Sequence, residues 1–388
     1  MMVQRHRLKL HVENLGPIRD ASLTFADLTV LIGPQASGKS ISLQLLKLLV
    51  DTGAVQARLR RYGLDWRGSL DVLLDTYFGE GMHAIWAAGK TRVSWLGKSV
   101  DLAGIARRQR RDDTEAMFLI PAQRVLAMRS GWPLPFESYS PGDPFAVRDF
   151  SEQLRKLLET EFTKELLFPQ NRRLKSEFRD LLKRDVFGGF ELRVDRLRSQ
   201  KRLVLGQEGN PEGLPHMVWS AGQREFIPLL LGLYWLMPPT KTPRRGHLDW
   251  VVIEEPEMGL HPRAITGFLL MVLELLRRGY RVCLSTHSTQ VLEFAWALRN
   301  LQDAKASDDA VLNMFDLRPN QATRALGATA LKTGIAVHYY DGATGRTHDI
   351  SRLDPSAPQQ FEAAWGGLTE FTERVNREVA LAVASDRK

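Results

Sequence analysis

The stretch Gly33-Pro34-Gln35-Ala36-Ser37-Gly38-Lys39-Ser40 decides the fold of this chain. It follows a short apolar run at residues 28–32 and precedes a segment with the periodicity of an amphipathic helix. A glycine-bounded loop between a strand and a helix is the context that a phosphate-binding P-loop requires. The N–H groups of such a loop point inward at phosphate oxygens, and the helix N-terminus adds its partial positive charge.

Two side chains of this loop extend the prediction. Lys39 would reach the β- and γ-phosphates of a nucleoside triphosphate, and the Ser40 hydroxyl would bind Mg²⁺. The alternative is a chance match in a glycine loop, and the flanking strand and helix argue against it. We therefore expect residues 33–40 to bind a nucleoside triphosphate with its magnesium ion.

A second motif is an apolar strand that ends in carboxylates, Val-Val-Ile-Glu-Glu-Pro-Glu at residues 251–257. Glu254 would hold the Mg²⁺ shell, and Glu255 would orient and deprotonate the attacking water. The alternative is a solvated acidic loop, which the presence of a P-loop disfavours. Aspartate is more usual at the position of Glu254, so the sequence leaves direct and water-mediated metal contact both open.

A third motif is the signature turn, residues 220–225, which contains Ser220, Gly222 and Gln223 and precedes an apolar run. A small, hydroxyl-bearing turn at a helix start can bind an anion, although the pattern equally describes an ordinary N-cap. Its place between the P-loop and the acidic strand favours anion binding. Pro228 removes an interior hydrogen bond, which predicts a helix that begins late or is kinked.

A fourth motif places His287 directly after the apolar run at residues 281–285. A histidine there can contact a γ-phosphate, and a structural histidine is the alternative. The order of the four motifs favours the contact with phosphate.

In that order the four motifs resemble those of an ABC-type ATPase. Residues 14–18 (Asn-Leu-Gly-Pro-Ile), 118–124 (Phe-Leu-Ile-Pro-Ala-Gln-Arg) and 254–262 (Glu-Glu-Pro-Glu-Met-Gly-Leu-His-Pro) are similar to prokaryotic ATPases grouped with the overcoming-lysogenization-defect (OLD) family. That group includes ATPase subunits of anti-phage defence systems. It is related to the coiled-coil ATPases of chromosome maintenance and double-strand-break repair.

The resemblance implies an α/β fold, a P-loop NTPase of ABC-ATPase type. Its mostly parallel sheet would be flanked by helices, with a β-rich N-terminal part and a helical insertion. ATP would lie in a head-to-tail homodimer, between the P-loop of one subunit and the signature turn of the other, with Ser220 and Gly222 acting in trans. His287 would be the switch histidine, and Gln123, or Arg124 beside it, would contact Mg²⁺.

The sequence pattern divides the chain into four parts. Residues 1–130 form an ATPase lobe with the P-loop, and residues 131–189 form a helical insertion. Residues 190–295 form the lobe with the signature turn, the acidic strand and the switch histidine. Residues 296–388 form a C-terminal subdomain with a hairpin and an amphipathic helix.

Composition adds constraints on partners and location. The net charge of +8 suits a nucleic-acid partner without requiring one, and the basic runs at residues 58–61 and 107–111 are either DNA contacts or solvated faces. A single cysteine excludes a disulfide framework. The N-terminal residues lack the apolar region of a signal peptide, and no apolar stretch is long enough to span a bilayer. We expect a cytoplasmic protein with no membrane partner.

The leading functional hypothesis is an ATPase whose ATP-dependent dimerisation controls a partner effector, a nuclease or toxin, in anti-phage defence. A DNA repair or chromosome-maintenance ATPase would carry long heptad arms, which the sequence lacks. A transporter subunit fits poorly with the insertions, and a non-hydrolysing scaffold fits poorly with intact Lys39, Glu255 and His287. The C-terminal carboxylates show no convincing catalytic cluster, so we expect no intrinsic nuclease activity.

Overall fold

The computed structural model describes residues 8–110, 112–162, 166–170, 173–197, 200–207, 212–239 and 243–385. The strands are β1 (Leu8–Leu15), β2 (Ile18–Phe25), β3 (Leu28–Ile32), β4 (Arg92–Trp95), β5 (Lys98–Ser99), β6 (Met117–Ile120), β7 (Met128–Arg129), β8 (Trp132–Pro133), β9 (Leu166–Phe168), β10 (Glu191–Leu197), β11 (Gln200–Gly206), β12 (Gly213–Pro215), β13 (Trp250–Glu254), β14 (Arg281–Ser285), β15 (Ile335–Asp341) and β16 (Arg346–Asp349).

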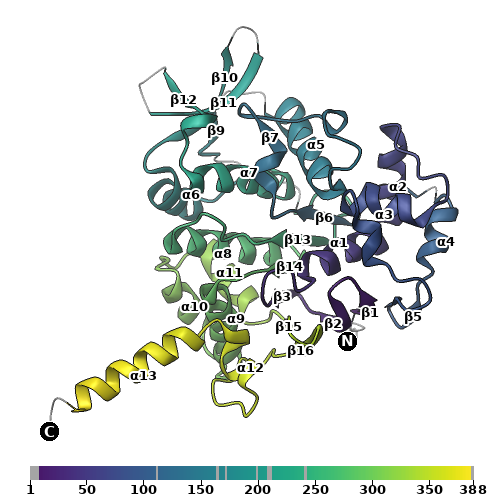
Figure 1. Ribbon diagram of the computed structural model, residues 1–388. Coiled ribbons are helices and arrows are strands. Elements are labelled where there is room, and N and C mark those ends of the chain that lie inside the picture. Colours follow the sequence, from purple (N-terminus) through teal and green to yellow (C-terminus); the bar gives the residue numbers. More distant parts are fainter. Residues whose placement is uncertain are drawn as a thin grey trace.

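The α-helices are α1 (Lys39–Val50), α2 (Thr52–Arg61), α3 (Leu70–Phe78), α4 (Leu102–Arg107), α5 (Phe145–Thr160), α6 (Ser176–Leu182), α7 (Ala221–Leu236), α8 (Pro262–Arg277), α9 (Thr289–Asp303), α10 (Asp308–Met314), α11 (Gln321–Ala330), α12 (Gln360–Ala363) and α13 (Glu370–Ser385). Two short 3-10 turns matter below, η2 (Arg124–Ala127) and η5 (His216–Val218). Figure 1 shows their arrangement.

One ten-stranded sheet organises the molecule, in the order β5-β4-β1-β2-β16-β15-β3-β14-β13-β6. Its five strands from β15 to β6 run parallel. The strands on the other side belong to antiparallel hairpins formed by β1 with β2 and β4, and by β15 with β16. The predicted α/β class, with a β-rich N-terminal part, is confirmed.

The central strands β3, β13 and β14 are almost entirely buried and mostly apolar, because helices cover the sheet on both faces. In β3, the side chains of Leu28, Val30 and Ile32 join one hydrophobic core, and that of Leu31 joins the other. Successive side chains of a strand point to opposite faces, so each short run contributes to both cores. Helices α5, α7 and α8 contribute to the first core, and α1, α2 and α3 to the second.

The predicted helical insertion contains α5 and α6, with strand β9 between them. Strand β9 joins the later strands β10, β11 and β12 in a small second sheet, in the order β12-β11-β10-β9. This small sheet lies at the top of Figure 1. Of the two effects predicted for Pro228, the late start of α7 is wrong, because α7 starts at Ala221 and runs through Pro228, and the kink stays a prediction. A capping box between Ser220 and Gln223 satisfies the first N–H groups and fixes this start.

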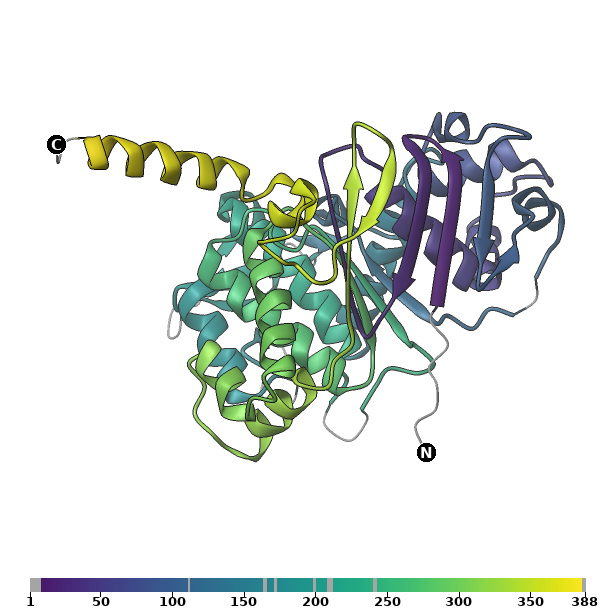
Figure 2. The same ribbon diagram turned by 90° about the horizontal axis from the view of Figure 1, so that it is seen from below.

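The C-terminal segments divide between the sheet and a projecting helix. Strand β15 pairs with β3, so the hairpin expected in a C-terminal subdomain lies within the main sheet, beside the N-terminal strands (Figure 2). Helix α13 extends away from the rest of the molecule (Figure 2), and its Phe371 is 72% exposed. The four domain boundaries stay a prediction. Within the described ranges, none of the helices has the length and apolar character needed to cross a membrane.

Candidate nucleotide-binding site

Three of the four sequence motifs, and Gln123, follow parallel strands at one edge of the sheet. The P-loop follows β3, the acidic pair ends β13, His287 follows β14, and Gln123 follows β6. Two backbone bonds hold these strand ends in register: the N–H of Thr286 donates to the carbonyl of Leu31 (3.0 Å), and the N–H of Glu255 donates to the carbonyl of Ser285 (2.9 Å). The carboxyl edge of a parallel sheet is where such folds bind ligands.

Two glycines shape the P-loop. Gly33 and Gly38 have φ angles of 144° and 101°, a region that L-residues avoid. A Cβ on Gly33 would lie 2.4 Å from the carbonyl oxygen of Tyr340, and a Cβ on Gly38 would lie 2.5 Å from Ile18 Cγ1. Only glycine fits these positions, so the loop keeps the curled backbone that phosphate binding requires.

Lys39 lies inside this loop. Its side chain is buried, and its Nζ donates to the carbonyls of Gly33 (2.7 Å) and Pro34 (2.7 Å). Burial lowers the pKa of Lys39, and the nearby carboxylates, Glu255 foremost, oppose the shift. The ammonium group is therefore held inside the curl of the loop by two backbone carbonyls, and the oxygens of a bound phosphate could take the place of these acceptors.

Glu254 is the most strongly perturbed acid of the site. It is fully buried, and its Oε2 accepts the N–H of Ala122 (3.2 Å). Burial raises the pKa of Glu254 to about 7, and the neighbouring Glu255 adds to the effect, while the hydrogen bonds from Ala122 and the Ser40 hydroxyl oppose it. The Oε1 atom has no hydrogen-bond partner among the described residues. A buried carboxylate with a free oxygen beside a serine hydroxyl is an oxygen donor set that fits Mg²⁺.

Glu255 and His287 form the solvent-accessible part of the site. Glu255 Oε1 lies 3.3 Å from His287 Nε2, and the two side chains are 27% and 30% exposed. Glu255 has a φ of 43°, an uncommon value for a residue other than glycine. The side chain of Glu257 accepts the N–H of His287, which fixes the loop after β14 against the acidic turn. A carboxylate that reaches water here has the access that a general base needs.

Gln123 and Arg124, the two candidates for a contact with Mg²⁺, have different surroundings. Gln123 is exposed, whereas Arg124 is completely buried. Arg124 donates to the carbonyls of Glu225 (3.1 Å), Glu254 (3.0 Å) and Glu255 (3.1 Å). Burial lowers its pKa, and the Glu225 carboxylate, 3.4 Å away, is the foremost group opposing this. Arg124 thus joins the acidic strand end to the first turn of α7, a role that sequence reasoning missed.

Two N–H groups of the signature turn are satisfied within the turn. The Ser220 hydroxyl accepts the N–H of Gln223 (3.2 Å), and the Gln223 side chain accepts the N–H of Ser220 (3.0 Å). A Cβ on Gly222 would lie 2.6 Å from the carbonyl of Gly259, so the turn packs closely on the loop after the acidic strand. Helix α7 packs on α5 and η2, whereas α1 packs on α2 and β6. No hydrogen bond or ion pair of the described residues joins this turn to the P-loop.

A buried ion-pair network anchors the helix after the P-loop, and no sequence motif indicated it. Lys47 pairs with Asp51 (2.7 Å) and Glu115 (2.5 Å) and also donates to the carbonyl of Met117 in β6. Burial alone would lower the pKa of Lys47, but Asp51 and Glu115 outweigh it and raise the pKa. The network ties α1 to the sheet strand that leads into Gln123.

One residue of the basic run at residues 58–61 also belongs to this ion-pair network. Arg58 pairs with buried Asp149 and is not part of a solvated basic face. The second run contains the exposed Arg107, and its Arg111 lies outside the described residues.

A family model described as "AAA domain, putative AbiEii toxin, Type IV TA system" matches residues 146–293. The match includes the signature turn, the acidic pair and His287, and leaves the P-loop outside. It covers less than half of the chain. A comparison with curated protein sequences gives no match.

The comparison with solved structures gives matches of low similarity. An SMC head bound to the C-terminal winged-helix domain of ScpA has a TM-score of 0.41 and 11% identity, over 88% of this chain and 95% of that one. The SMC head domain from Thermotoga maritima has a TM-score of 0.32 and 15% identity, over 74% and 91%. An ATP-binding subunit of an ABC transporter has a TM-score of 0.35 and 15% identity, over 93% and 99%.

No functional argument rests on similarities of this size. The sheet order, the P-loop geometry and the family match together give the chain an ABC-like P-loop ATPase fold.

Proposed function

We propose that this chain binds ATP with Mg²⁺ and hydrolyses the γ-phosphate bond. The observation that carries the proposal is the convergence of the P-loop, the acidic pair and His287 at one sheet edge, with a free oxygen of buried Glu254 beside Ser40. In this proposal residues 33–40 hold the phosphates. Lys39 neutralises the β- and γ-phosphates, and Ser40 and Glu254 hold the magnesium ion.

The remaining roles follow from exposure and hydrogen bonding. Glu255 accepts the proton of the attacking water, and His287 contacts the γ-phosphate from the same side. Gln123 is the candidate for a further contact with Mg²⁺, because its neighbour Arg124 is occupied by three backbone carbonyls. The bound magnesium would also stabilise the charged form of Glu254, which burial disfavours.

We further propose that a second copy of the chain completes the ATP-binding site. The signature turn packs on the Gly259 loop rather than on the P-loop of its own chain, and Ser220 is exposed. In a head-to-tail homodimer, Ser220, Gly222 and Gln223 of one subunit would contact the γ-phosphate held by the other.

The proposed biological role is control of an effector protein, a nuclease or toxin, in anti-phage defence by a cytoplasmic ATPase of the OLD-like group. The motifs quoted from the sequence and the match to a family model whose description names a type IV toxin–antitoxin system support this role. DNA binding, as in repair ATPases, is the competing role. We expect no nuclease activity from this chain alone.

Sizing of Glu255→Gln with and without ATP tests the dimer. The variant should bind ATP without cleaving it and should shift to the size of a dimer only when ATP is present. Adding Ser220→Arg should abolish the shift while ATP binding persists, because the new side chain would block the partner's phosphate. A dimer that survives Ser220→Arg would contradict the trans arrangement. Loss of ATP binding in Lys39→Ala alone tests the nucleotide site separately.

A further inference from the structure

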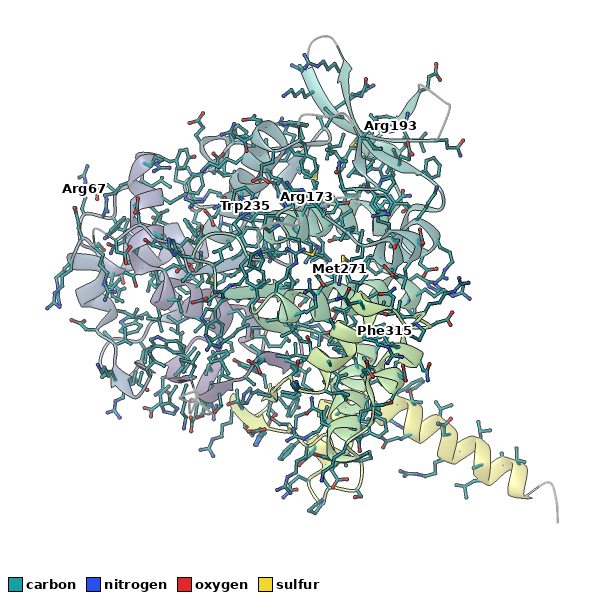
Figure 3. All side chains as sticks on the ribbon, turned by 180° about the vertical axis from the view of Figure 1, so that it is seen from behind. Arg67, Arg173, Arg193, Trp235, Met271 and Phe315 are labelled. Carbon is teal, nitrogen blue, oxygen red and sulfur yellow. The ribbon has the colours of Figure 1, made fainter. Side chains whose placement is uncertain are left out.

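A second pocket lies outside the nucleotide site and is lined by residues of the β7–β8 hairpin, of β11 and β12 in the small sheet, and of η5. Figure 1 labels β7, β11 and β12. Its volume is about 490 Å³. Pockets for small ligands have volumes of about 300–1,000 Å³. The neighbouring strand β10 carries Arg193, which is labelled in Figure 3 and pairs with Glu191.

The charge of this pocket is positive. Arg129, Lys201 and Arg202 line it, and no carboxylate is among its described lining residues. Arg202 is paired with Asp195 at 2.7 Å, whereas Arg129 and Lys201 are exposed. The two exposed cations come from different segments of the chain and face one cavity, which favours an anionic ligand.

The pocket also has an aromatic wall. Trp132 is partly exposed, and Lys201 Nζ lies 5.9 Å from its ring centroid. An indole beside cations is the combination with which proteins bind nucleotide units, since the base stacks on the ring and the cations neutralise the phosphate.

His216 supplies an independent observation. Its side chain lines the pocket and is only 7% exposed, and neither ring nitrogen has a hydrogen-bond partner among the described residues. Burial lowers the pKa of His216, and nearby Arg224 adds to this, so the ring is neutral and carries one unpaired donor and one unpaired acceptor. Buried polar groups in folded proteins are normally satisfied by protein, water or ligand.

We infer that this pocket binds a nucleotide unit separate from the ATP of the P-loop, either a free nucleotide or one unit of a single-stranded nucleic acid. The phosphate lies between Arg129 and Lys201, and the base packs on Trp132. A polar group of the ligand, or a water molecule that it holds, satisfies the imidazole of His216.

The position of His216 couples this pocket to the signature turn. His216 begins η5, its ring packs edge-on against Trp219 with centroids 4.9 Å apart, and Trp219 directly precedes Ser220. A ligand in the pocket therefore contacts the segment that leads into the turn. The resulting effect of the ligand on ATP turnover rests on the proposed function, whereas the binding itself does not.

Fluorescence anisotropy at low salt tests the binding, with a labelled oligothymidylate as the probe. The Lys39→Ala background keeps the probe from being held by the P-loop. Replacing both exposed cations, Arg129→Gln with Lys201→Gln, should weaken binding about tenfold or more, and Trp132→Ala should weaken it by a similar factor, as expected for loss of one base stack. Lys90→Gln with Lys98→Gln, which removes two exposed charges outside the pocket and outside both basic runs, is the matched control and should bind as the background does.

Competition identifies the form of the ligand. Displacement by unlabelled oligothymidylate but not by thymidine monophosphate assigns a strand, and equal displacement by both assigns a free nucleotide. Displacement by inorganic phosphate alone, as efficient as by nucleotide, would overturn recognition of the base. The proposal also fails if the Lys39→Ala protein does not bind the probe, or if the Arg129 and Lys201 substitutions leave binding unchanged. Circular dichroism of each variant shows whether the fold is kept. Stimulation of wild-type ATP turnover by the oligonucleotide, lost in His216→Asn, tests the coupling separately.

Discussion

The P-loop and the signature turn are both glycine-containing turns at the start of a helix, yet they differ in how their polar groups are satisfied. In the P-loop, buried Lys39 points into the loop, and the carboxylates of neighbouring strands gather beside it. In the signature turn, Ser220 and Gln223 satisfy each other, and the turn is exposed. The first turn holds a buried cation inside its loop, whereas the second is capped by its own side chains and leaves Ser220 exposed.

The largest expected effect comes from the chemistry beside the P-loop. Glu255→Gln should lower the rate of ATP hydrolysis about 10²–10⁴-fold, because the amide cannot accept the proton of the attacking water. ATP binding should persist in this variant and be lost in Lys39→Ala. Phosphate release and equilibrium binding measure the two effects. Hydrolysis by Glu255→Gln at the wild-type rate, with contaminating ATPase excluded, would show that another group is the base.

The next-largest expected effect is on stability and concerns α1, the helix that begins at the end of the P-loop. Lys47→Met should lower the free energy of unfolding by about 3–5 kcal/mol, because it leaves the buried carboxylate of Asp51 without a cation among the described residues, while Glu115 keeps only Arg58 at 3.5 Å. Denaturant unfolding measures the change. The exposed Lys90→Met is the control and should be nearly neutral. Equal stability of the two variants would mean that the network contributes little.

Glu254 should make the stability of the nucleotide-free protein depend on pH. Its folded-state pKa of about 7 lies above its ordinary value of 4.5, so the folded state holds a proton that the unfolded state has lost. The stabilisation of the folded state by this proton is complete below pH 4.5 and is lost as the pH rises through 7. Glu254→Gln should therefore unfold like wild type at pH 4 but be more stable by about 3 kcal/mol at pH 8.

Thermal and denaturant unfolding at the two pH values check this prediction for Glu254. The exposed Glu137→Gln is its control and should show no such difference. A gain of Glu254→Gln that is equal at both pH values would contradict the assignment. The same variant should also lose hydrolysis, because an amide is a poor ligand for the magnesium ion.

The smallest effect sharpens the contrast between the two turns. Ser220→Ala should cost about 1 kcal/mol of stability through loss of its cap. Ser69→Ala, which removes the cap of α3, should cost a similar amount. Only Ser220→Ala should weaken the ATP-dependent dimer when both are placed in the Glu255→Gln background. If both substitutions weaken the dimer equally, the turn acts only as a cap.

The sequence predicted the parts of the site whose chemistry is local. The P-loop and the acidic pair are read from consecutive residues, and the strands that carry them are buried apolar runs. The bridge made by Arg124 and the network around Lys47 depend on contacts between residues far apart in the chain, for which no short motif exists. The pocket at His216 was missed for the same reason. The late start expected for α7 was wrong because local capping outweighed the effect of Pro228.

Because β15 pairs with β3, the support of the P-loop is complete only after the C-terminal strand β15 has been synthesised. Tyr340, near the end of β15, places its carbonyl against Gly33, so a strand from the last part of the sequence supports the loop from the first part. During synthesis, a nascent chain that ends before Ile335 has β3 with one neighbour instead of two. If the P-loop binds nucleotide as proposed, we expect a polypeptide that ends before Ile335 to carry the motif without this support.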